Sequence, residues 1–410
     1  MLWKDNESDI DFLNFDYLVK AVTSIIQDDK LTPSTIGVYG DWGSGKSSLM
    51  KMVEKEIEGN EDYLCIDFNG WLFEGYDDAQ SALCGTILDT LYQKGRLSAK
   101  LKRKARALLS SIDGKHLLSK GVKVGLDVLL TGGIGSLTEV TVGGFLNFLR
   151  NKGHEISEAD VEEYLKKYQN AKDDNSKRKE IAKFKENFKE IFEQSEINHL
   201  VVFIDELDRC SPDTVLEIFE AMRLFLYTEG TTFVIGADER LMKFAIKSKY
   251  KDIPGNTLDI SQEYLEKIIQ YPIHIPQLDA KEVHQYITCL LLLRTDVSDA
   301  SIVEATKHIG FDEVFNYEKA ITYLNIQDAN VKDMVQDAFA LSGAISPDLA
   351  VIMKGNPRHC KRFLNAMFLR MQMAKSRDVS LNSTILAKLM LVEVTIQPLP
   401  RTHLCVPSYK

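Results

Sequence analysis

Residues 36–50, IGVYGDWGSGKSSLM, carry residue types at a spacing that suits phosphate binding. Gly40, Gly45, Lys46 and Ser47 match the pattern G-x-x-x-x-G-K-[ST] of the phosphate-binding loop, or P-loop. Glycines let the backbone curl so that successive N–H groups point at phosphate oxygens, and the lysine supplies a cation for the β- and γ-phosphates. Ser47 is placed to put its hydroxyl on Mg²⁺. The pattern therefore predicts a site for a Mg²⁺-bound nucleotide.

A second chemical pattern lies at residues 200–209, LVVFIDELDR. An apolar run of strand length is followed directly by Asp205 and Glu206, which is the arrangement of a Walker B strand. Asp205 would hold Mg²⁺, through water or together with Ser47. Glu206 would act as the general base that takes a proton from the attacking water. An apolar strand that ends in two acids is a weak signal alone, and the upstream P-loop gives it meaning.

The expected nucleotide contacts run through the P-loop and into the following helix. They are Gly40, Asp41, Trp42, Gly43, Ser44, Gly45, Lys46, Ser47 and Ser48. We assign catalysis to Lys46, Glu206 and Arg358. Arg358 follows Gly355-Asn356-Pro357, where a proline in the first turn marks a helix start, and from there it can swing onto a γ-phosphate. Without the other motifs, a basic helix surface would be the favoured explanation of Arg358.

Several strands and helices must position these residues. Near-continuous apolar runs predict buried strands of a parallel sheet at residues 35–39, 63–68, 200–204 and 231–236, and an edge strand at 272–276. A helix at 48–57 follows the P-loop, and its N-terminal dipole favours an anion. A further helix is expected at 12–27. Residues 11–15 at its start either hold adenine or belong to a core helix, and both interpretations stay open.

Two more segments follow strand ends, where open α/β sheets bind ligands. Residues 70–78, GWLFEGYDD, bring aromatic side chains that either contact a ligand or pack beneath a loop. Asp238 and Arg240 follow the strand at 231–236 and are candidates to sense the γ-phosphate, with a charged surface loop as the alternative. Arg209 and Arg240 are candidates to complete a neighbouring subunit's site.

The domain organisation follows from shifts in composition. Residues 94–123 contain ten Lys or Arg residues and a single Asp, and a glycine-rich apolar stretch follows at 125–148. We expect residues 94–148 to form a removable helical insertion outside the P-loop core, which contacts a protein partner or, less favourably, an anionic membrane surface. Asp127 and Glu139 interrupt the apolar stretch and argue against a spanning helix. The predicted ranges are 1–92 and 197–276 for the core, 93–196 for the insertion and 277–410 for a helical domain, which the family resemblance given below implies to be a lid.

Composition sets broad limits on the kind of protein. The 410 residues are 44% hydrophobic and 27% charged, as in ordinary globular proteins, and the formal net charge is -10. Affinity for nucleic acid would therefore have to be local or indirect. The polar, acidic start lacks the pattern of a secretory signal, which predicts a cytoplasmic protein. The six cysteines form no C-x-x-C pair, so we expect reduced structural thiols and no zinc site.

In combination these motifs resemble the KAP family of P-loop NTPases, which is related to the AAA and STAND ATPases. The matching pieces are Trp3 with Asp11-Phe12-Leu13, then GDWGSGKSS, NGWLFEGYDD, FIDELDRC, YLEKIIQ and NPRHCKRFLN. The resemblance implies an α/β fold in which helices sandwich the parallel sheet, ATP and Mg²⁺ as ligands, and a helical lid whose sensor arginine is Arg358. It also implies ATP-linked oligomers that act as switches. Many KAP proteins carry membrane-spanning helices at the position of residues 125–148, and this chain departs from that pattern.

The resemblance extends to biology, because similar bacterial proteins take part in antiphage defence, including the Qat type of system. We therefore expect an ATPase that switches a larger complex of protein subunits or of its own copies. A P-loop phosphotransferase is an alternative, although Glu206 beside Asp205 favours activation of water. A module that binds ATP with little hydrolysis is another. A GTPase is disfavoured because Asn151-Lys152 continues as Gly153-His154 and breaks the guanine-reading pattern N-K-x-D.

Overall fold

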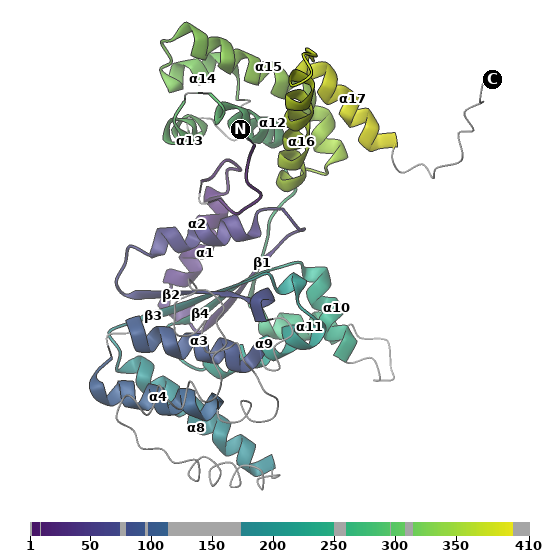
Figure 1. Cartoon of the computed structure of the whole chain (residues 1–410). Coiled ribbons are helices and arrows are strands. Elements are labelled where there is room, and N and C mark those ends of the chain that lie inside the picture. Colours follow the sequence, from purple (N-terminus) through teal and green to yellow (C-terminus); the bar gives the residue numbers. More distant parts are fainter. Residues whose placement is uncertain are drawn as a thin grey trace, which may run out of the picture. The chain divides into compact units, whose positions relative to one another are not determined.

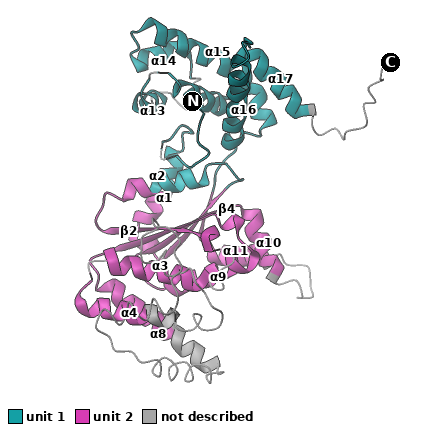
Figure 2. Cartoon of the chain, in the orientation of Figure 1, with its two compact units in different colours: residues 1–21, 40–53, 274–410 teal, residues 22–39, 54–273 magenta. Residues whose placement is uncertain are grey.

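The structure is a computed structural model that describes residues 2–8, 10–73, 79–94, 97–113, 174–249, 260–295, 297–307 and 315–396. The chain divides into two compact units, which are coloured separately in Figure 2. Unit 1 comprises Met1–Ala21, Gly40–Val53 and His274–Lys410. Unit 2 comprises Val22–Tyr39 and Glu54–Ile273. Helices α1 (Asp16–Gln27) and α2 (Lys46–Ile57) each contain residues of both units.

Unit 2 is built on a five-stranded sheet of order β2-β3-β4-β1-β5 (Figure 1). Its strands are β1 (Ser34–Tyr39), β2 (Tyr63–Asn69), β3 (His199–Asp205), β4 (Thr231–Ala237) and β5 (Tyr271–His274). The neighbours β2 and β3, β3 and β4, and β4 and β1 all pair in parallel. Every residue of β1 and β4 is buried, which fits their continuous apolar sequences. The predicted α/β parallel sheet is confirmed.

The register of the strands brings their carboxyl ends to one edge. Asn69, the last residue of β2, is paired with Asp205, the last residue of β3. Tyr39 at the end of β1 is likewise paired with Ala237 at the end of β4. The chain leaves β1 directly into the P-loop at Gly40. Ligands of open parallel sheets bind at this edge, so the motifs follow strands that end where a ligand is expected.

Helices pack on this sheet and share one hydrophobic core with it. They are α3 (Ala79–Lys94), α4 (Ala99–Asp113), α8 (Asp174–Glu193), α9 (Pro212–Phe225), α10 (Glu239–Lys249) and α11 (Ile260–Ile268). Short 3-10 helices are η1 (Asp29–Leu31), η2 (Gly70–Phe73) and η3 (Leu207–Arg209). The start of α9 is well capped, because Ser211 accepts a hydrogen bond from the Thr214 N–H and Pro212 occupies the first turn.

Helix α4 belongs to the core of unit 2. Leu101, Ala105 and Leu108 of α4, with Leu97 just before it, are buried in the same cluster as Phe188 of α8 and the sheet strands. The prediction that residues 94–148 lie outside the core is therefore wrong for α4. The prediction relied on the many Lys and Arg residues of this segment. Its apolar residues recur at helical spacing and face the core, while the Lys and Arg side chains cover the other sides of the helix. The stretch at 125–148 lies outside the described residues, and the predicted domain ranges stay predictions.

Unit 1 contains a helical bundle with its own hydrophobic core. Its helices are α12 (Ala280–Leu292), α13 (Asp299–Lys307), α14 (Tyr317–Leu324), α15 (Ala329–Ile352), α16 (Pro357–Lys375) and α17 (Ser383–Ile396). The helical pattern predicted beyond residue 276 is therefore confirmed over the described part of this region. A capping box fixes the start of α12: Asp279 accepts from the backbone N–H of Glu282, and the Glu282 side chain accepts from the N–H of Asp279.

The turn between α15 and α16 fixes where α16 begins. Gly355 has a φ of 60°, and a Cβ there would lie 2.2 Å from the carbonyl oxygen of Leu278, so no other residue fits without a shift. Asn356 then caps α16 by accepting a hydrogen bond from the His359 N–H at 3.1 Å. Pro357 stands at the first helical position. The predicted helix start at this sequence is confirmed, and Arg358 lies in the first turn of α16.

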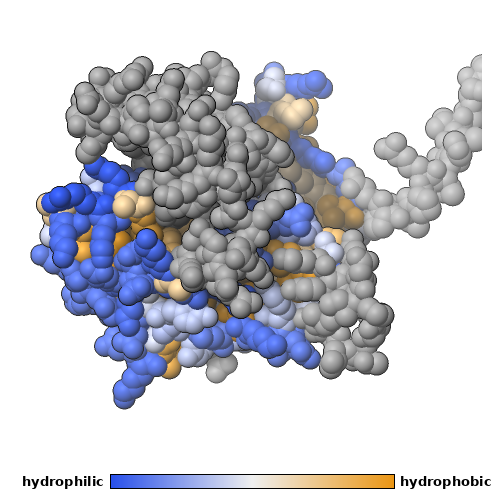
Figure 3. All heavy atoms as spheres, turned by 90° about the horizontal axis from the view of Figure 1, so that it is seen from below, coloured by the Kyte–Doolittle hydropathy of each residue, from blue (hydrophilic) through white to orange (hydrophobic). Residues whose placement is uncertain are grey.

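The surface of the described chain is mostly hydrophilic in the view of Figure 3, with hydrophobic residues in smaller groups. Among the residues that the structure describes, no helix has both the length and the apolar character needed to cross a membrane.

We predict that Leu101→Ala destabilises unit 2 by about 2–5 kcal/mol, because the leucine is buried and its removal leaves a cavity. Arg103→Ala is the matched control, since Arg103 lies on the exposed side of the same helix. Urea unfolding of both variants measures the difference. Equal midpoints for Leu101→Ala and the parent would show that α4 is not part of the core.

Candidate functional site

The P-loop has the backbone conformation that its glycines permit. Gly43 and Gly45 have φ values of 84° and 105°, a region that other residues rarely adopt. Helix α2 begins at Lys46, directly after the second of these glycines. The first N–H groups of an α-helix have no partner within the helix, and in α2 they belong to Lys46, Ser47 and Ser48. The loop thus ends in N–H donors and a helix dipole that both favour an anion.

The side chain of Lys46 lies within the loop. Its ammonium donates hydrogen bonds to the carbonyl oxygens of Gly40 at 3.1 Å and Asp41 at 3.3 Å, and the residue is only 6% exposed. The Ser44 N–H closes the loop by donating to the Asp41 carbonyl at 3.0 Å. The Ser44 hydroxyl oxygen is buried and has no hydrogen-bond partner among the described residues. A buried cation and an unsatisfied hydroxyl in one loop fit a phosphate group.

The segment before α1 lies against the P-loop within unit 1. A Cβ on Gly45 would lie 2.9 Å from the ring of Phe15 and 3.5 Å from Leu13. The Ser48 hydroxyl accepts a hydrogen bond from the Ser8 N–H at 3.1 Å, so its expected nucleotide contact would have to share this oxygen. Asp11 organises the segment by accepting hydrogen bonds from two backbone N–H groups. The role of residues 11–15 at adenine stays a prediction.

The start of α16 rests on the P-loop, also within unit 1. The Asn356 side-chain amide donates to the Trp42 carbonyl at 2.9 Å, and the Arg358 N–H donates to the Gly43 carbonyl at 3.4 Å. A Cβ on Gly43 would lie 2.6 Å from the Cβ of Arg358. The Arg358 guanidinium lies 5.4 Å from the ring centre of Trp42. Three residues assigned from sequence, Trp42, Gly43 and Arg358, are thus in contact.

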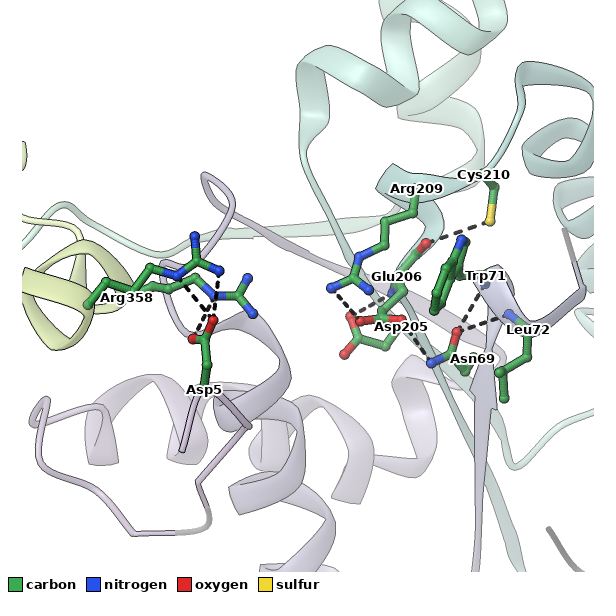
Figure 4. A network of polar contacts seen from close by, with 10 residues as sticks. Asp5, Asn69, Trp71, Leu72, Asp205, Glu206, Arg209, Cys210 and Arg358 are labelled. Carbon is green, nitrogen blue, oxygen red and sulfur yellow. Dashed lines mark hydrogen bonds and ion pairs between the residues drawn. The ribbon is translucent and has the colours of Figure 1, made fainter. Parts of the chain in front are cut away.

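The guanidinium of Arg358 is paired with Asp5, a residue that the sequence did not single out (Figure 4). Its Nε donates to Asp5 Oδ1 at 2.8 Å, and Arg362 donates to the other oxygen of the same carboxylate. Burial alone would raise the pKa of Asp5, but the hydrogen bonds and charges of the two arginines lower it below its usual value. The carboxylate is therefore ionised at neutral pH.

In unit 2, the two acids at the end of β3, Asp205 and Glu206, are held in fixed positions (Figure 4). Glu206 has a φ of 59°, which is uncommon for a residue with a side chain and is typical of functional sites. Its Oε2 accepts a hydrogen bond from the Asn69 amide at 3.0 Å, and its Oε1 is 2.8 Å from a guanidinium nitrogen of Arg209. Asp205 accepts a hydrogen bond from the Glu206 N–H at 2.8 Å. The carboxylate of Glu206 is thus positioned from two sides.

Asn69 was not predicted as a site residue. Its side-chain oxygen accepts hydrogen bonds from the Trp71 N–H at 3.0 Å and the Leu72 N–H at 3.3 Å, which turns its amide group toward Glu206. The Arg209 guanidinium also lies 5.4 Å from the ring centre of Trp71. The sequence signal that could have identified Asn69 is a polar residue at the carboxyl end of a buried strand. Residues 71 and 72 of the aromatic segment therefore orient Asn69, which in turn holds Glu206. Residues 74–78 lie outside the described residues.

The pair after β4 forms a local contact. Asp238 is 7% exposed and accepts hydrogen bonds from the Arg240 N–H at 2.9 Å and from its guanidinium at 3.0 and 2.6 Å. The carboxylate therefore caps the start of α10 and pairs with a largely exposed guanidinium. Their roles at a γ-phosphate, and those of Arg209 and Arg240 at a neighbouring subunit, stay predictions.

Cysteines and metal ligands add no further site in the described residues. Within the described residues, Cys65, Cys84, Cys210, Cys289 and Cys360 form no disulfide bond, and Cys405 lies outside the described residues. Burial raises the pKa of the Cys65 thiol to about 12, which keeps it protonated and unreactive. Within the described part of the chain, no group of three or more His, Cys, Asp or Glu residues is placed to hold a metal ion.

Comparison with known proteins agrees with this geometry. The family model described as the KAP family P-loop domain matches residues 15–373. The chain belongs to the KAP family. It is also similar to the uncharacterized protein MJ0182 of Methanocaldococcus jannaschii, at 22% identity over 183 residues, which cover 43% of this chain and 90% of that protein. Membership of a P-loop NTPase family implies nucleotide binding, and such domains typically use a nucleoside triphosphate with Mg²⁺.

We predict that Gly43→Ala weakens nucleotide binding by about 5- to 150-fold. The new methyl group would meet the stem of Arg358, and the positive φ would be strained, which together cost about 1–3 kcal/mol. Gly59→Ala is the control, because a Cβ there meets nothing within 4 Å. Titration with a fluorescent nucleotide measures both. Parental affinity in a folded Gly43→Ala protein would contradict the assigned role of this contact.

Proposed function

We propose that this KAP protein binds and hydrolyses Mg-ATP. The observation that carries the proposal is the P-loop, in which two glycines at positive φ place the Lys46 ammonium and the first N–H groups of α2 around one loop. The buried, unsatisfied hydroxyl of Ser44 supports an anionic ligand there. ATP is the nucleotide that the KAP resemblance implies.

The residue roles are part of this proposal. Residues 40–48 bind the phosphates, with Lys46 as the cation, and Ser47 and Asp205 hold Mg²⁺. Arg358 contacts the γ-phosphate, which is supported by its position against Gly43 of the P-loop. Bound Mg²⁺ would neutralise phosphate charge.

Glu206 is the proposed general base. It takes a proton from a water molecule as the water oxygen bonds to the γ-phosphorus and the bond from that phosphorus to the β–γ bridging oxygen breaks. The products are ADP and inorganic phosphate. Support comes from the fixed carboxylate, which Asn69 and Arg209 hold at the end of β3. Asn69 and Arg209 each engage one oxygen, and every carboxylate oxygen has a second acceptor direction for water.

Two other functions would use the same P-loop. A P-loop phosphotransferase would pass the phosphoryl group to an acceptor, and a regulatory module would hold ATP with little turnover. Phosphate release, measured with and without candidate acceptors, separates them. Release from ATP and water alone supports the hydrolase, release that needs an acceptor supports transfer, and tight binding without release supports the module.

We further propose that turnover drives a switch in an assembly of its own copies or of other protein subunits. Antiphage defence is the proposed setting, and it rests on the resemblance of the motif set to bacterial defence proteins. Sedimentation without nucleotide, with ADP and with a non-hydrolysable ATP analogue tests the assembly step. Plaque counts with the parental gene and with an inactive variant test the setting.

We expect Lys46→Ala to lose most of its affinity for ATP, because the change removes the charge that pairs with the phosphates and leaves the hydrophobic cores intact. Lys55→Ala is the control, an exposed lysine in the last turn of the same helix. Calorimetric titration with Mg-ATP measures both proteins. Unchanged affinity in folded Lys46→Ala would remove the basis of the proposed site.

Glu206→Gln should bind Mg-ATP like the parent and hydrolyse it about 10²- to 10⁴-fold more slowly, since the amide keeps the shape and cannot take a proton. Asp205→Asn should instead raise the Mg²⁺ concentration needed for activity. Phosphate release under saturating ATP gives both results. If Glu206→Gln hydrolyses at the parental rate, the base lies elsewhere, and Asp208 is the next residue to replace.

A further inference from the structure

The start of α16 concentrates positive charge where a helix disfavours it. Arg358 and Arg362 lie in the first two turns of α16, with Lys361 between them. Helix N-termini carry a partial positive charge, so cations there are repelled by the dipole and by one another. Arg358 nevertheless stays close to the P-loop, with 23% of its side chain exposed. A nearby anion would offset this repulsion.

The anion in the structure is the carboxylate of Asp5, whose two oxygens serve different arginines. Oδ1 accepts from Nε of Arg358 at 2.8 Å. Oδ2 accepts from Nε of Arg362 at 3.2 Å and from its Nη2 at 2.8 Å. Charge-assisted hydrogen bonds of this kind are among the stronger contacts in proteins. Asp5 therefore hydrogen-bonds to both guanidinium groups and offsets the charge of each.

The contact leaves the outer end of Arg358 available. The hydrogen bond to Asp5 comes from Nε of Arg358. Neither terminal nitrogen of Arg358 donates a hydrogen bond to any residue that the structure describes. The stem is fixed as well, because Gly43 lies directly beneath its Cβ and Cδ. A guanidinium fixed at its stem and at Nε can still offer both terminal NH₂ groups to an anion.

Asp5 is itself held in place by the N-terminal arm, which we define as residues 3–8. At one end, the backbone of Trp3 exchanges hydrogen bonds of 2.9 and 2.8 Å with the side chain of Asn365 on α16. The Trp3 indole N–H donates to the Leu290 carbonyl at 3.1 Å, and the guanidinium of Arg294 lies 5.6 Å from the ring centre. These contacts fix the arm on the helical bundle.

The other end of the arm is attached to α2, the helix that follows the P-loop. The Ser8 N–H donates to the hydroxyl of Ser48 at 3.1 Å, and Glu7 pairs with Lys51 at 3.6 Å. The arm thus runs from α16 to α2 within unit 1, with Asp5 between the two attachments. Its position does not depend on the two arginines alone.

We propose that Asp5 is a positioning residue, which holds the guanidinium of Arg358 beside the P-loop so that its terminal nitrogens contact the γ-phosphate. This inference rests on the proposed ATPase function and assigns the N-terminal arm a part in it. Asp5 touches no phosphate. It acts by keeping Arg358 oriented before the nucleotide binds, which avoids the entropic cost of ordering a long side chain.

The test compares Asp5→Ala, Arg358→Ala and the double variant with the parent. Asp333→Asn is the control, which removes a negative charge from an exposed site on α15. Asp5→Ala should lower kcat by about tenfold or more and keep ADP affinity within about twofold, because only the γ-phosphate contact is lost. The preference for a non-hydrolysable ATP analogue over ADP should fall by a similar factor. Thermal unfolding confirms that each variant is folded.

The double variant separates positioning from a structural role. If Asp5 acts through Arg358, Asp5→Ala should have no further effect in the Arg358→Ala protein. Equal additional losses in both backgrounds would overturn the inference, and so would a parental or increased rate for Asp5→Ala alone. A parent that binds ATP without hydrolysis would refute the hydrolase instead, and the ATP preference of Asp5→Ala would still decide the role of Asp5. A parent that binds no nucleotide would refute both.

Discussion

The close approach of α16 to the P-loop is the contact through which the helical bundle holds this loop within unit 1. It requires a glycine at position 43, because any Cβ there would collide with the stem of Arg358, and it requires the sharp turn at Gly355 that starts α16. Asn356 then serves both elements, since its side chain caps α16 and also donates to the Trp42 carbonyl. The P-loop and a helix that carries an arginine are thereby held together by the Asn356 side chain and by the hydrogen bond from the Arg358 N–H to the Gly43 carbonyl.

Fixed carboxylates are a second feature of the chain, and each is held by a different neighbour. Glu206 is held by Asn69 from the adjacent strand and by Arg209 from the following 3-10 helix. Asp238 is held by Arg240 two residues later. Asp5 is held by two arginines more than 350 residues away in sequence. In each case the partner fixes the position of the carboxylate, and the proposed hydrolysis would use charge that is preorganised in this way.

Much of the fold and of the motif positions could be predicted from the sequence, for reasons that differ between elements. Buried parallel strands are continuous apolar runs, so β1, β3 and β4 were visible, and the helix start at Pro357 has its own sequence signal. Helix α4 was misjudged because its cations outnumber its buried leucines. Asn69 and Asp5 were missed because their roles depend on partners distant in sequence, Glu206 and Arg358. Register and tertiary contacts set these pairs, and no local pattern records them.

Each of the three tryptophans of the chain lies near an arginine side chain, which affects how the protein can be followed by fluorescence. Arg294, Arg358 and Arg209 place a guanidinium 5.6, 5.4 and 5.4 Å from the ring centres of Trp3, Trp42 and Trp71, respectively. The indole rings thus lie in the arm, in the P-loop and beside the Walker B acids. A displaced guanidinium changes the electric field at its indole and hence the emission. Proteins that retain a single tryptophan would therefore report optically, and without an added label, on each of the three places in turn.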